Sequence, residues 1–282
     1  MTKYAHTVPV LMYHHVSPSP GPITTSVANF EDHLSWLAAN GYRSITTDEL
    51  AAHLKGEPVL HKSVLITFDD GYLDNWVYAY PLLKKYGYTA AIFLVTSWVN
   101  DGPARPNMGQ ADLPPTPDHH ECERRIHAGD SDSVILRWSE IKAMQVGGVV
   151  EFHSHTHTHT RWDQSERAAE KNALIAEELA LSRNALQENL GSVSEHLCWP
   201  QGYFDPDYVR IAQEAGFRYL YTTEPFGQNC AEADPTHIYR FAVRNTTGAS
   251  VGRRIQVAAH TVAGPVFNRF KLWNRARKRK NA

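Results

Sequence analysis

Short apolar segments alternate with amphipathic segments along the whole chain. The apolar segments are rich in β-branched and aromatic residues, which favours strands, and they lie at 8–14, 44–47, 63–69, 90–95, 149–155, 196–200, 219–223 and 238–243. Segments with helical periodicity lie between them, at 28–40, 48–54, 75–86, 139–146, 164–190 and 206–215. This alternation predicts a mostly parallel sheet with helices outside it. Seven or eight such units favour a closed or nearly closed β/α barrel over an open sheet.

Two segments depart from this alternation. Residues 100–137 hold five prolines and two adjacent histidines without a convincing period, which predicts a long loop that is functional or disordered. Residues 269–282 hold seven basic residues and no acidic one. No linker divides the rest, so we expect a single barrel domain at 1–264 and a basic amphipathic tail at 265–282.

Composition narrows the class of protein. The chain of 282 residues is 42% hydrophobic and 21% charged, with a formal net charge of −2, which gives no basic field for nucleic acid. Its three cysteines, at 122, 198 and 230, share no short spacing, which is typical of neither a disulfide framework nor a thiolate zinc site. No long apolar run follows a basic start, and none is long enough to span a membrane, so a cytoplasmic location is the default expectation.

The tail has two interpretations of equal weight. Its apolar residues recur at helical spacing, at Val266, Phe267, Phe270 and Trp273. A basic amphipathic helix of this kind is typical of peripheral contact with a membrane, here the inner face, and would suggest a lipid-linked amino sugar as substrate. Alternatively, the aromatic residues dock on the barrel and the basic end is solvated.

Two adjacent carboxylates, Asp69 and Asp70, follow the apolar run Val64-Leu65-Ile66. Neighbours in an extended chain point to opposite sides, so the two carboxylates cannot do the same job. One can bind a metal ion while the other acts as a base beside it. An Asp-Asp-Gly turn that merely closes a strand is the structural alternative.

Four histidines lie within the seven residues 153–159, directly after another apolar segment. His155 and His159 are four apart, which places both rings on one face if the chain enters a helical turn. His153 and His157 are rival ligands on the pattern alone, and a polar surface loop is the structural alternative. Two histidines and one carboxylate hold a divalent ion and leave room for water and substrate.

Two weaker signals also follow strands. Pro200, Gln201, Gly202 and Tyr203 end one predicted strand, and His14 and His15 end the first. Each has an ordinary structural explanation by itself. However, all four signals fall at the carboxyl ends of strands, where β/α barrels build their active sites.

These motifs resemble those of the polysaccharide deacetylases, the NodB-homology group of carbohydrate esterase family four. Thr67-Phe68-Asp69-Asp70-Gly71 and Ser154-His155-Thr156 with His159 match the first two motifs, and Trp199-Pro200-Gln201-Gly202 stands where the third belongs. The opening Pro9-Val10-Leu11-Met12-Tyr13-His14 and Trp138-Ser139-Glu140-Ile141 look like the branch with the poly-N-acetylglucosamine deacetylases. The resemblance covers residues 8–244.

The resemblance implies a fold, a cofactor and residue roles. The fold would be a distorted (β/α)7 barrel in a single domain. One divalent ion would be held by Asp70, His155 and His159, with zinc the first choice and cobalt, nickel or iron the alternatives. Asp69 would be the general base. A backbone N–H near Gln201 would hold the oxyanion, with Pro200 and Tyr203 beside the substrate.

Two departures from the family pattern affect this assignment. Cys198 and Gln201 stand where many members have an arginine and an aromatic residue, so we expect no arginine to orient the catalytic base. The late histidine that serves as general acid in many members has no clear counterpart, because His260 follows the last predicted strand by a wide margin. The biofilm-type branch resembles a layout with an early histidine in that role, here His14.

The sequence therefore predicts a metal-dependent hydrolase that removes N-acetyl groups from an amino-sugar glycan or a lipid-linked sugar. The alternatives are an O-acetyl esterase or small-amide hydrolase of the same family, and a non-catalytic glycan-binding relative.

Overall fold

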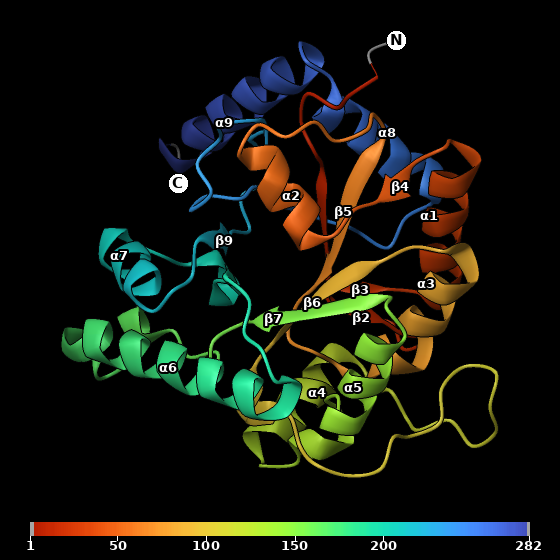
Figure 1. Cartoon of the computed structure of the whole chain (residues 1–282), viewed down its shortest axis with the longest axis vertical. Helices are drawn as coiled ribbons and strands as arrows, with labels where there is room; N and C mark the ends of the chain where they lie inside the picture. Colours follow the sequence, from red (N-terminus) through yellow and green to blue (C-terminus); the bar gives the residue numbers. More distant parts are fainter. Residues whose placement is uncertain (1–2, 281–282) are drawn as a thin grey trace.

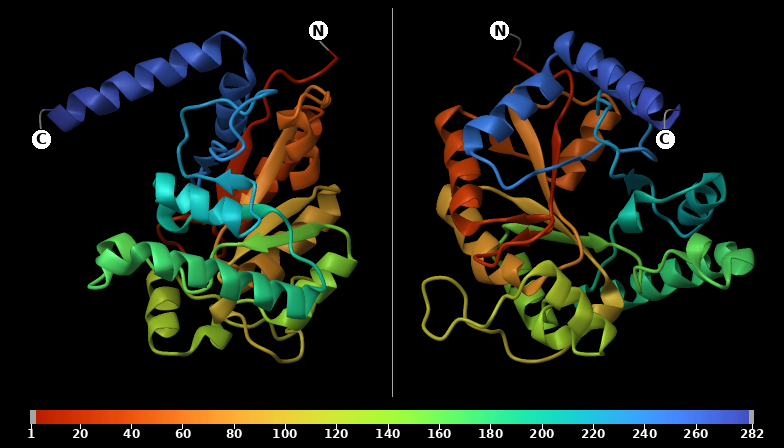
Figure 2. Two further views of the ribbon diagram at one scale, coloured as in Figure 1. Left: turned by 60° about the vertical axis from the view of Figure 1, so that its left-hand side comes forward. Right: turned by 180° about the vertical axis from the view of Figure 1, so that it is seen from behind.

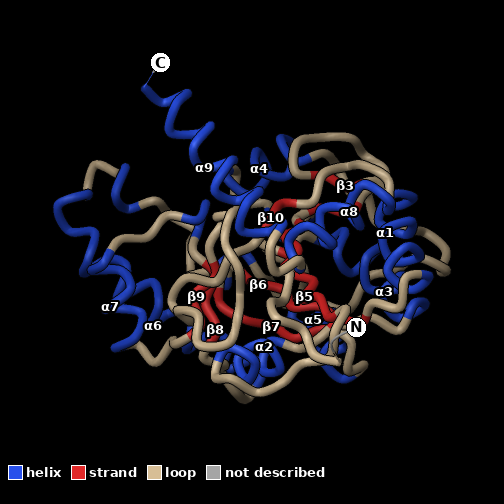
Figure 3. The backbone as a smooth tube through the Cα atoms, turned by 90° about the horizontal axis from the view of Figure 1, so that it is seen from above, coloured by secondary structure: helices blue, strands red, loops and turns tan. Residues whose placement is uncertain are grey.

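A curled parallel sheet forms the centre of the molecule in the computed structural model, which describes residues 3–280 and their side chains up to residue 278. Its strands are β1 (Val10–Tyr13), β4 (Arg43–Ser44), β5 (Ser63–Phe68), β6 (Ala90–Leu94), β7 (Val150–Ser154), β8 (His196–Cys198), β9 (Tyr219–Tyr221) and β10 (Phe241–Ala242). They follow the order β10-β1-β5-β6-β7-β8-β9, with β4 paired to β5, and every pair is parallel. A parallel bridge from Tyr221 to Ile238 extends the pairing from β9 toward the segment before β10. The predicted β/α barrel is therefore confirmed, with only this isolated bridge between its two ends among the described residues. Figure 3 shows the strands at the centre of the molecule with helices around them.

Helices cover the outside of this sheet (Figure 1). They are α1 (Val27–Ala39), α2 (Thr47–Leu54), α3 (Tyr80–Tyr86), α4 (His119–His127), α5 (Trp138–Val146), α6 (Lys171–Leu190), α7 (Pro206–Glu214), α8 (Gly248–Ala259) and α9 (Ala263–Lys280). A π-helical turn, Asn75–Ala79, precedes α3, and two short strands, β2 (His15–Val16) and β3 (Thr24–Thr25), pair beside the barrel. Local sequence sets the helix starts: the Thr46 side chain accepts from Glu49 N–H and Glu49 bonds back to Thr46, so α2 begins with a capping box.

Large side chains fill the space that the strands enclose. The rings of Phe93 on β6 and Tyr221 on β9 lie 4.8 Å apart, although these strands are not neighbours in the sheet. Leu65 on β5 and Cys198 on β8 belong to the same buried cluster. This packing fixes the positions of the strand ends relative to one another, and the functional residues follow those ends.

Segment 100–137 is not entirely the loop that the sequence predicted. Figure 1 shows its first part as a protruding loop, but residues 119–127 form α4. Asp118 caps this helix by accepting from Glu121 N–H at 3.0 Å, and Cys122 is its one buried residue. The helical period was hidden because so polar a helix carries almost no apolar stripe.

Helix α8 was also absent from the prediction. Its Gly248 and Gly252 disfavour a helix, yet both face α1, where a Cβ on Gly252 would lie 2.2 Å from the Trp36 ring. The two glycines therefore let α8 pack directly on α1, and this tertiary contact outweighs their low helical propensity.

The tail forms α9, which projects from the barrel (Figure 2). Phe267 is half-buried against Phe226, with ring centroids 6.3 Å apart, whereas Phe270 and Trp273 are 56% and 57% exposed. Residues 281–282 and the side chains of Arg279 and Lys280, which belong to the predicted tail, lie outside the described part. No helix in that part combines the length and hydropathy of a membrane span.

Candidate active site

One cavity of about 470 Å³ is lined by residues that directly follow the strands. His14 follows β1, Asp69 and Asp70 follow β5, His155 and His159 follow β7, and Gln201 follows β8. In a parallel barrel these carboxyl ends share one rim, so residues that are distant in sequence meet there.

Asp70, His155 and His159 form a compact cluster. Asp70 Oδ1 lies 3.4 Å from His155 Nε2 and 3.6 Å from His159 Nε2, and one ligand atom from each residue lies within 4.8 Å of the others. Asp70 Oδ1 is buried and has no hydrogen-bond partner among the described residues. An anionic oxygen and two ring nitrogens around one point, with the oxygen otherwise unsatisfied, fit a divalent cation.

Hydrogen bonding and burial act differently on the residues of this cluster. His155 Nδ1 lies 2.8 Å from the Cys198 carbonyl, so this nitrogen carries the proton and Nε2 offers its lone pair. Burial lowers the pKa of His159 to about 4, which keeps its imidazole neutral, as metal binding requires. Burial alone would raise the pKa of Asp70, but the close approach of His155 and the charges of the nearby histidines lower it.

The two rival histidines lie elsewhere. His153 Nδ1 lies 2.6 Å from Ser194 Oγ and its Nε2 lies 3.1 Å from Thr47 Oγ1. His157 Nδ1 lies 2.9 Å from Thr96 Oγ1. Neither ring belongs to the cluster or lines the cavity.

The backbone around the cluster adopts left-handed conformations that are costly for residues with a Cβ. Asp70, Thr156 and His159 have φ values of 74°, 66° and 63°. Gly71 has φ 79°, and a Cβ there would lie 2.7 Å from Leu94 Cδ2, so this position needs glycine. Such strain persists where the surrounding structure over-determines it, as at ligand-holding sites.

An arginine holds Asp69, contrary to the expectation from the sequence. Arg240 Nη1 donates to Asp69 Oδ1 at 2.7 Å and Nη2 donates to Oδ2 at 2.8 Å, and both side chains are almost fully buried. Burial alone would raise the pKa of Asp69, but the charge of Arg240 and its hydrogen bonds lower it. Arg240 Nη2 also lies 2.9 Å from Cys198 Sγ. The arginine therefore reaches Asp69 from the segment just before β10, beside the small side chain at position 198.

A second group of potential metal ligands, Asp69, His155 and Cys198, is a poorer site. Both Asp69 oxygens already accept from Arg240, and His155 Nδ1 is bonded to a carbonyl. Burial raises the pKa of the Cys198 thiol, so it stays protonated. The cluster with Asp70 is the better cation site.

His14 lies at the cavity next to Asp69, with its Nε2 3.9 Å from Asp69 Oδ2. Burial lowers the pKa of His14, against the opposing charges of Asp69 and Asp70. His260, by contrast, is exposed at the start of α9, where its Nδ1 accepts from the N–H groups of Val262 and Ala263.

Of the three residues predicted to lie beside the substrate, only Gln201 lines the cavity. Gln201 lines the cavity with φ 53°, and its N–H makes no hydrogen bond to another described residue. Pro200 is buried, and the Tyr203 ring packs under the Arg161 guanidinium, whose Cζ lies 4.3 Å from the centroid of that ring. Neither Pro200 nor Tyr203 lines the cavity.

Sequence reasoning missed one wall of the cavity. His119, Glu123 and His127 of α4 line it at a spacing of four residues, together with Tyr72. His119 Nδ1 lies 3.3 Å from His15 Nε2, and His15 Nδ1 lies 2.6 Å from Asp74 Oδ2. The polar i, i+4, i+8 pattern of α4 was the available signal.

Known proteins match this chain over most of its length. The family described as polysaccharide deacetylase matches residues 56–220, which include the cluster and Asp69 but neither His14 nor Arg240. YxkH of Bacillus subtilis strain 168, itself named for this family, is 28% identical over 225 residues, covering 79% of this chain and 67% of YxkH.

A second relative is the poly-β-1,6-N-acetyl-D-glucosamine N-deacetylase of Staphylococcus aureus strain MSSA476. It is 26% identical over 206 residues, which cover 71% of this chain and 61% of that protein. The chain thus spans less than two thirds of this relative. The structure of IcaB from Ammonifex degensii has the same fold, with a TM-score of 0.70 at 24% identity over 90% of this chain and 98% of IcaB. The chain belongs to the polysaccharide deacetylase family.

Proposed function

We propose that this chain is a metal-dependent hydrolase that removes N-acetyl groups from an amino-sugar glycan. The observation that carries the proposal is the pairing of a cation site with a buried base: Asp70, His155 and His159 surround one point, and Arg240 fixes Asp69 beside it. A protein that only binds glycans has no need of a buried carboxylate held next to a cation site. The name of the S. aureus relative supports N-acetylglucosamine polymers as the substrate class.

The ligand set suits zinc best. Two neutral imidazoles and one carboxylate leave coordination positions open for water and substrate. Cobalt, nickel and iron accept the same donors. When bound, such an ion supplies Lewis-acid chemistry, since it lowers the pKa of a water and polarises the acetyl carbonyl.

Asp69 is placed to take a proton from the attacking water. Its pKa lies below the usual range, so the carboxylate is ionised at neutral pH. Because Arg240 donates to both carboxylate oxygens, the group cannot rotate away from the cavity. This fixed orientation favours proton transfer in one geometry.

His14 and Gln201 complete the reaction. The 3.9 Å between His14 Nε2 and Asp69 Oδ2 lets the imidazole receive the proton from the base after a small movement and pass it to the departing amine. The Gln201 N–H, at the rim of the cavity, is available to stabilise the oxyanion that forms at the acetyl carbonyl.

The test is the chemistry of the products. The full chain, stripped with a chelator and reloaded with zinc, is incubated with β-1,6- and β-1,4-linked N-acetylglucosamine oligomers and with an O-acetylated sugar. We expect acetate and new primary amines in equal amounts from an amide substrate. Acetate from the O-acetylated sugar alone would make the protein an esterase, and no acetate from a zinc-loaded protein would favour the non-catalytic alternative.

A further inference from the structure

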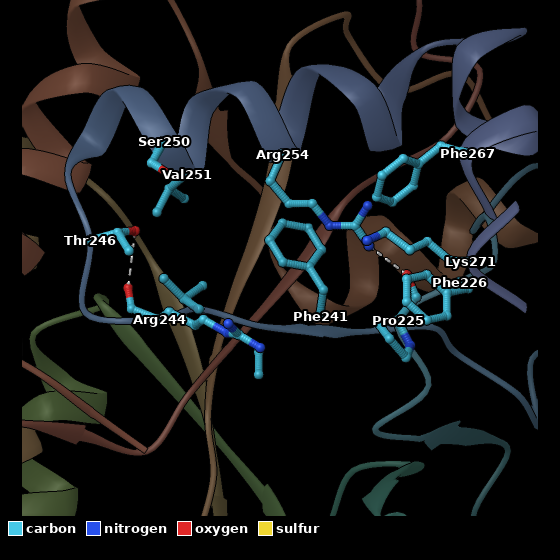
Figure 4. Close-up of a pocket in the computed structure, with 12 residues that line it drawn as sticks. Pro225, Phe226, Phe241, Arg244, Thr246, Ser250, Val251, Arg254, Phe267 and Lys271 are labelled. Atoms are coloured by element: carbon cyan, nitrogen blue, oxygen red, sulfur yellow. Dashed lines mark hydrogen bonds between the residues drawn. The ribbon is translucent and has the colours of Figure 1, made fainter. Parts of the chain in front are cut away.

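A second cavity, of about 350 Å³, lies between β10, α8, the first turns of α9 and residues 225–226 (Figure 4). It shares no lining residue with the catalytic cavity. Its size falls in the range of small-molecule sites, and its walls are largely apolar, which is typical of such sites.

The charges around this cavity are all of one sign. Arg244, Arg254 and Lys271 line it, and no aspartate or glutamate does. Within the described part of the chain, none of the three forms an ion pair with a carboxylate. Thr246 and Ser250 also line the cavity, and the Thr246 hydroxyl donates to the Arg244 carbonyl at 3.4 Å. The cavity therefore offers cations and hydrogen-bond donors without a protein counter-charge.

The Arg254 guanidinium in this cavity lacks a hydrogen-bond acceptor for one of its nitrogens among the described residues. Its guanidinium is stacked among Phe226, Phe241 and Phe267, with distances of 5.7, 5.0 and 4.8 Å to the ring centroids. Nη2 donates to the Pro225 carbonyl at 2.8 Å, but Nη1 is buried with no partner among the described residues. Ring faces attract the cation but do not replace an acceptor for its N–H groups. A half-buried guanidinium that keeps its proton is therefore short of an anionic acceptor.

We propose that this cavity binds a phosphate group that carries an apolar substituent. Arg254 and Lys271 lie near each other, with their cationic groups 4.8 and 5.3 Å from the Phe267 ring centroid, and together they match the negative charge of a phosphate. Phe226, Phe241 and Val251 provide the surface for the apolar part. A bare inorganic anion would leave that surface unused.

The phosphate has two potential sources, a lipid headgroup and a soluble phosphorylated compound. Lys271 belongs to α9, which also carries the exposed Phe270 and Trp273, and the Arg277 guanidinium lies 5.6 Å from the Trp273 ring centroid. A lipid held by its phosphate in the cavity would bring this face to the lipid surface. A soluble ligand would bind without involving Phe270 or Trp273.

The experiment is calorimetric titration of the full chain with dihexanoyl phosphatidic acid below its micelle concentration, dihexanoyl phosphatidylcholine and inorganic phosphate. We expect the phosphatidic acid to bind more tightly than either comparison ligand. Arg254→Gln and Lys271→Gln should each weaken it about tenfold or more, because each removes a charge-assisted contact. Arg253→Gln is the matched control, because Arg253 is an exposed cation of α8 that does not line the cavity.

Equal weakening by Arg253→Gln and Arg254→Gln would mean that the lipid responds only to overall charge and would overturn the proposal. Equal affinity for inorganic phosphate and phosphatidic acid would overturn the apolar part of it. If Arg254→Gln fails to fold, Lys271→Gln decides the matter, since Lys271 is exposed. Loss of sedimentation with phosphatidylglycerol vesicles in the cavity variants would identify a lipid source. Unchanged sedimentation with weakened phosphatidic acid binding would identify a soluble one.

Discussion

Replacing Arg240 by methionine tests whether the base depends on its buried partner. The Arg240 and Asp69 side chains are 0% and 2% exposed and share two charge-assisted hydrogen bonds of 2.7 and 2.8 Å. Removing one partner of such a pair leaves an uncompensated buried charge, which costs about 3–5 kcal/mol. We therefore expect the free energy of unfolding of Arg240→Met to fall by that amount, measured by urea denaturation at neutral pH.

The same substitution should change the pH dependence of catalysis. Arg240 lowers the pKa of Asp69, whereas burial raises it, so removing the arginine leaves burial to act alone. The pKa of Asp69 then rises, and the acidic limb of the kcat/KM profile should move to higher pH. Metal content, measured by atomic absorption, should be retained because Arg240 contacts none of the proposed ligands. Arg240→Lys should give an intermediate shift, since it keeps a charge but loses the bidentate geometry.

Arg210→Met provides the control. Arg210 pairs with Glu214 at 2.8 Å, but both side chains are more than half exposed and screened by solvent, so its loss should lower the free energy of unfolding far less than the loss of Arg240. A loss of stability in Arg240→Met as small as in this control, together with an unmoved acidic limb, would refute the role given to Arg240.

Four further predictions follow from the same geometry. His159→Ala should lose the metal and the activity, whereas His157→Ala should keep both, as measured by metal content and acetate release; metal retained by His159→Ala would contradict the ligand set. Asp69→Asn should keep the metal and lower kcat by about 10²–10⁴, so near-normal turnover would reduce Asp69 to a turn residue. His14→Gln should also keep the metal and lower kcat, and a normal rate would exclude it as the general acid. Burial lowers the pKa of His196 to about 4 in the folded protein, below the ordinary 6.5. The unfolded chain therefore binds the proton more readily, and roughly 3 kcal/mol of the free energy of unfolding should be lost as the pH falls from 6.5 to 4. In urea denaturation, His196→Gln should show a flatter dependence of this free energy on pH.

The strands and the cation cluster were predictable because each depends on local pattern. Asp70 and His155 directly follow apolar segments, and parallel strands bring such ends together. Choosing His159 over His157 needed the family resemblance, because it depends on the left-handed backbone at Thr156 and His159. No local pattern required that conformation.

Arg240 could not be found from local sequence. It lies 171 residues from Asp69 in the chain, and nothing around it marks a catalytic contact. The family pattern places an arginine at position 198, whereas here Arg240 fills the space beside Cys198 from the segment just before β10. Helices α4 and α8 were not predicted for a related reason, since neither shows the usual broad apolar stripe. Helix α4 is largely polar, and α8 packs on α1 through its glycines.

The pairing of β1 with β10 sets an order in which the site is completed during synthesis. Leu11 pairs with Phe241, so the strands at the two ends of the barrel sequence lie side by side. The ribosome therefore releases Asp69, Asp70 and both histidine ligands well before Arg240. Until β10 docks beside β1, a nascent chain could bring Asp70, His155 and His159 together while the Asp69 carboxylate still lacked Arg240. We expect the proposed hydrolytic activity to appear only after the growing polypeptide has gathered its proposed cation ligands.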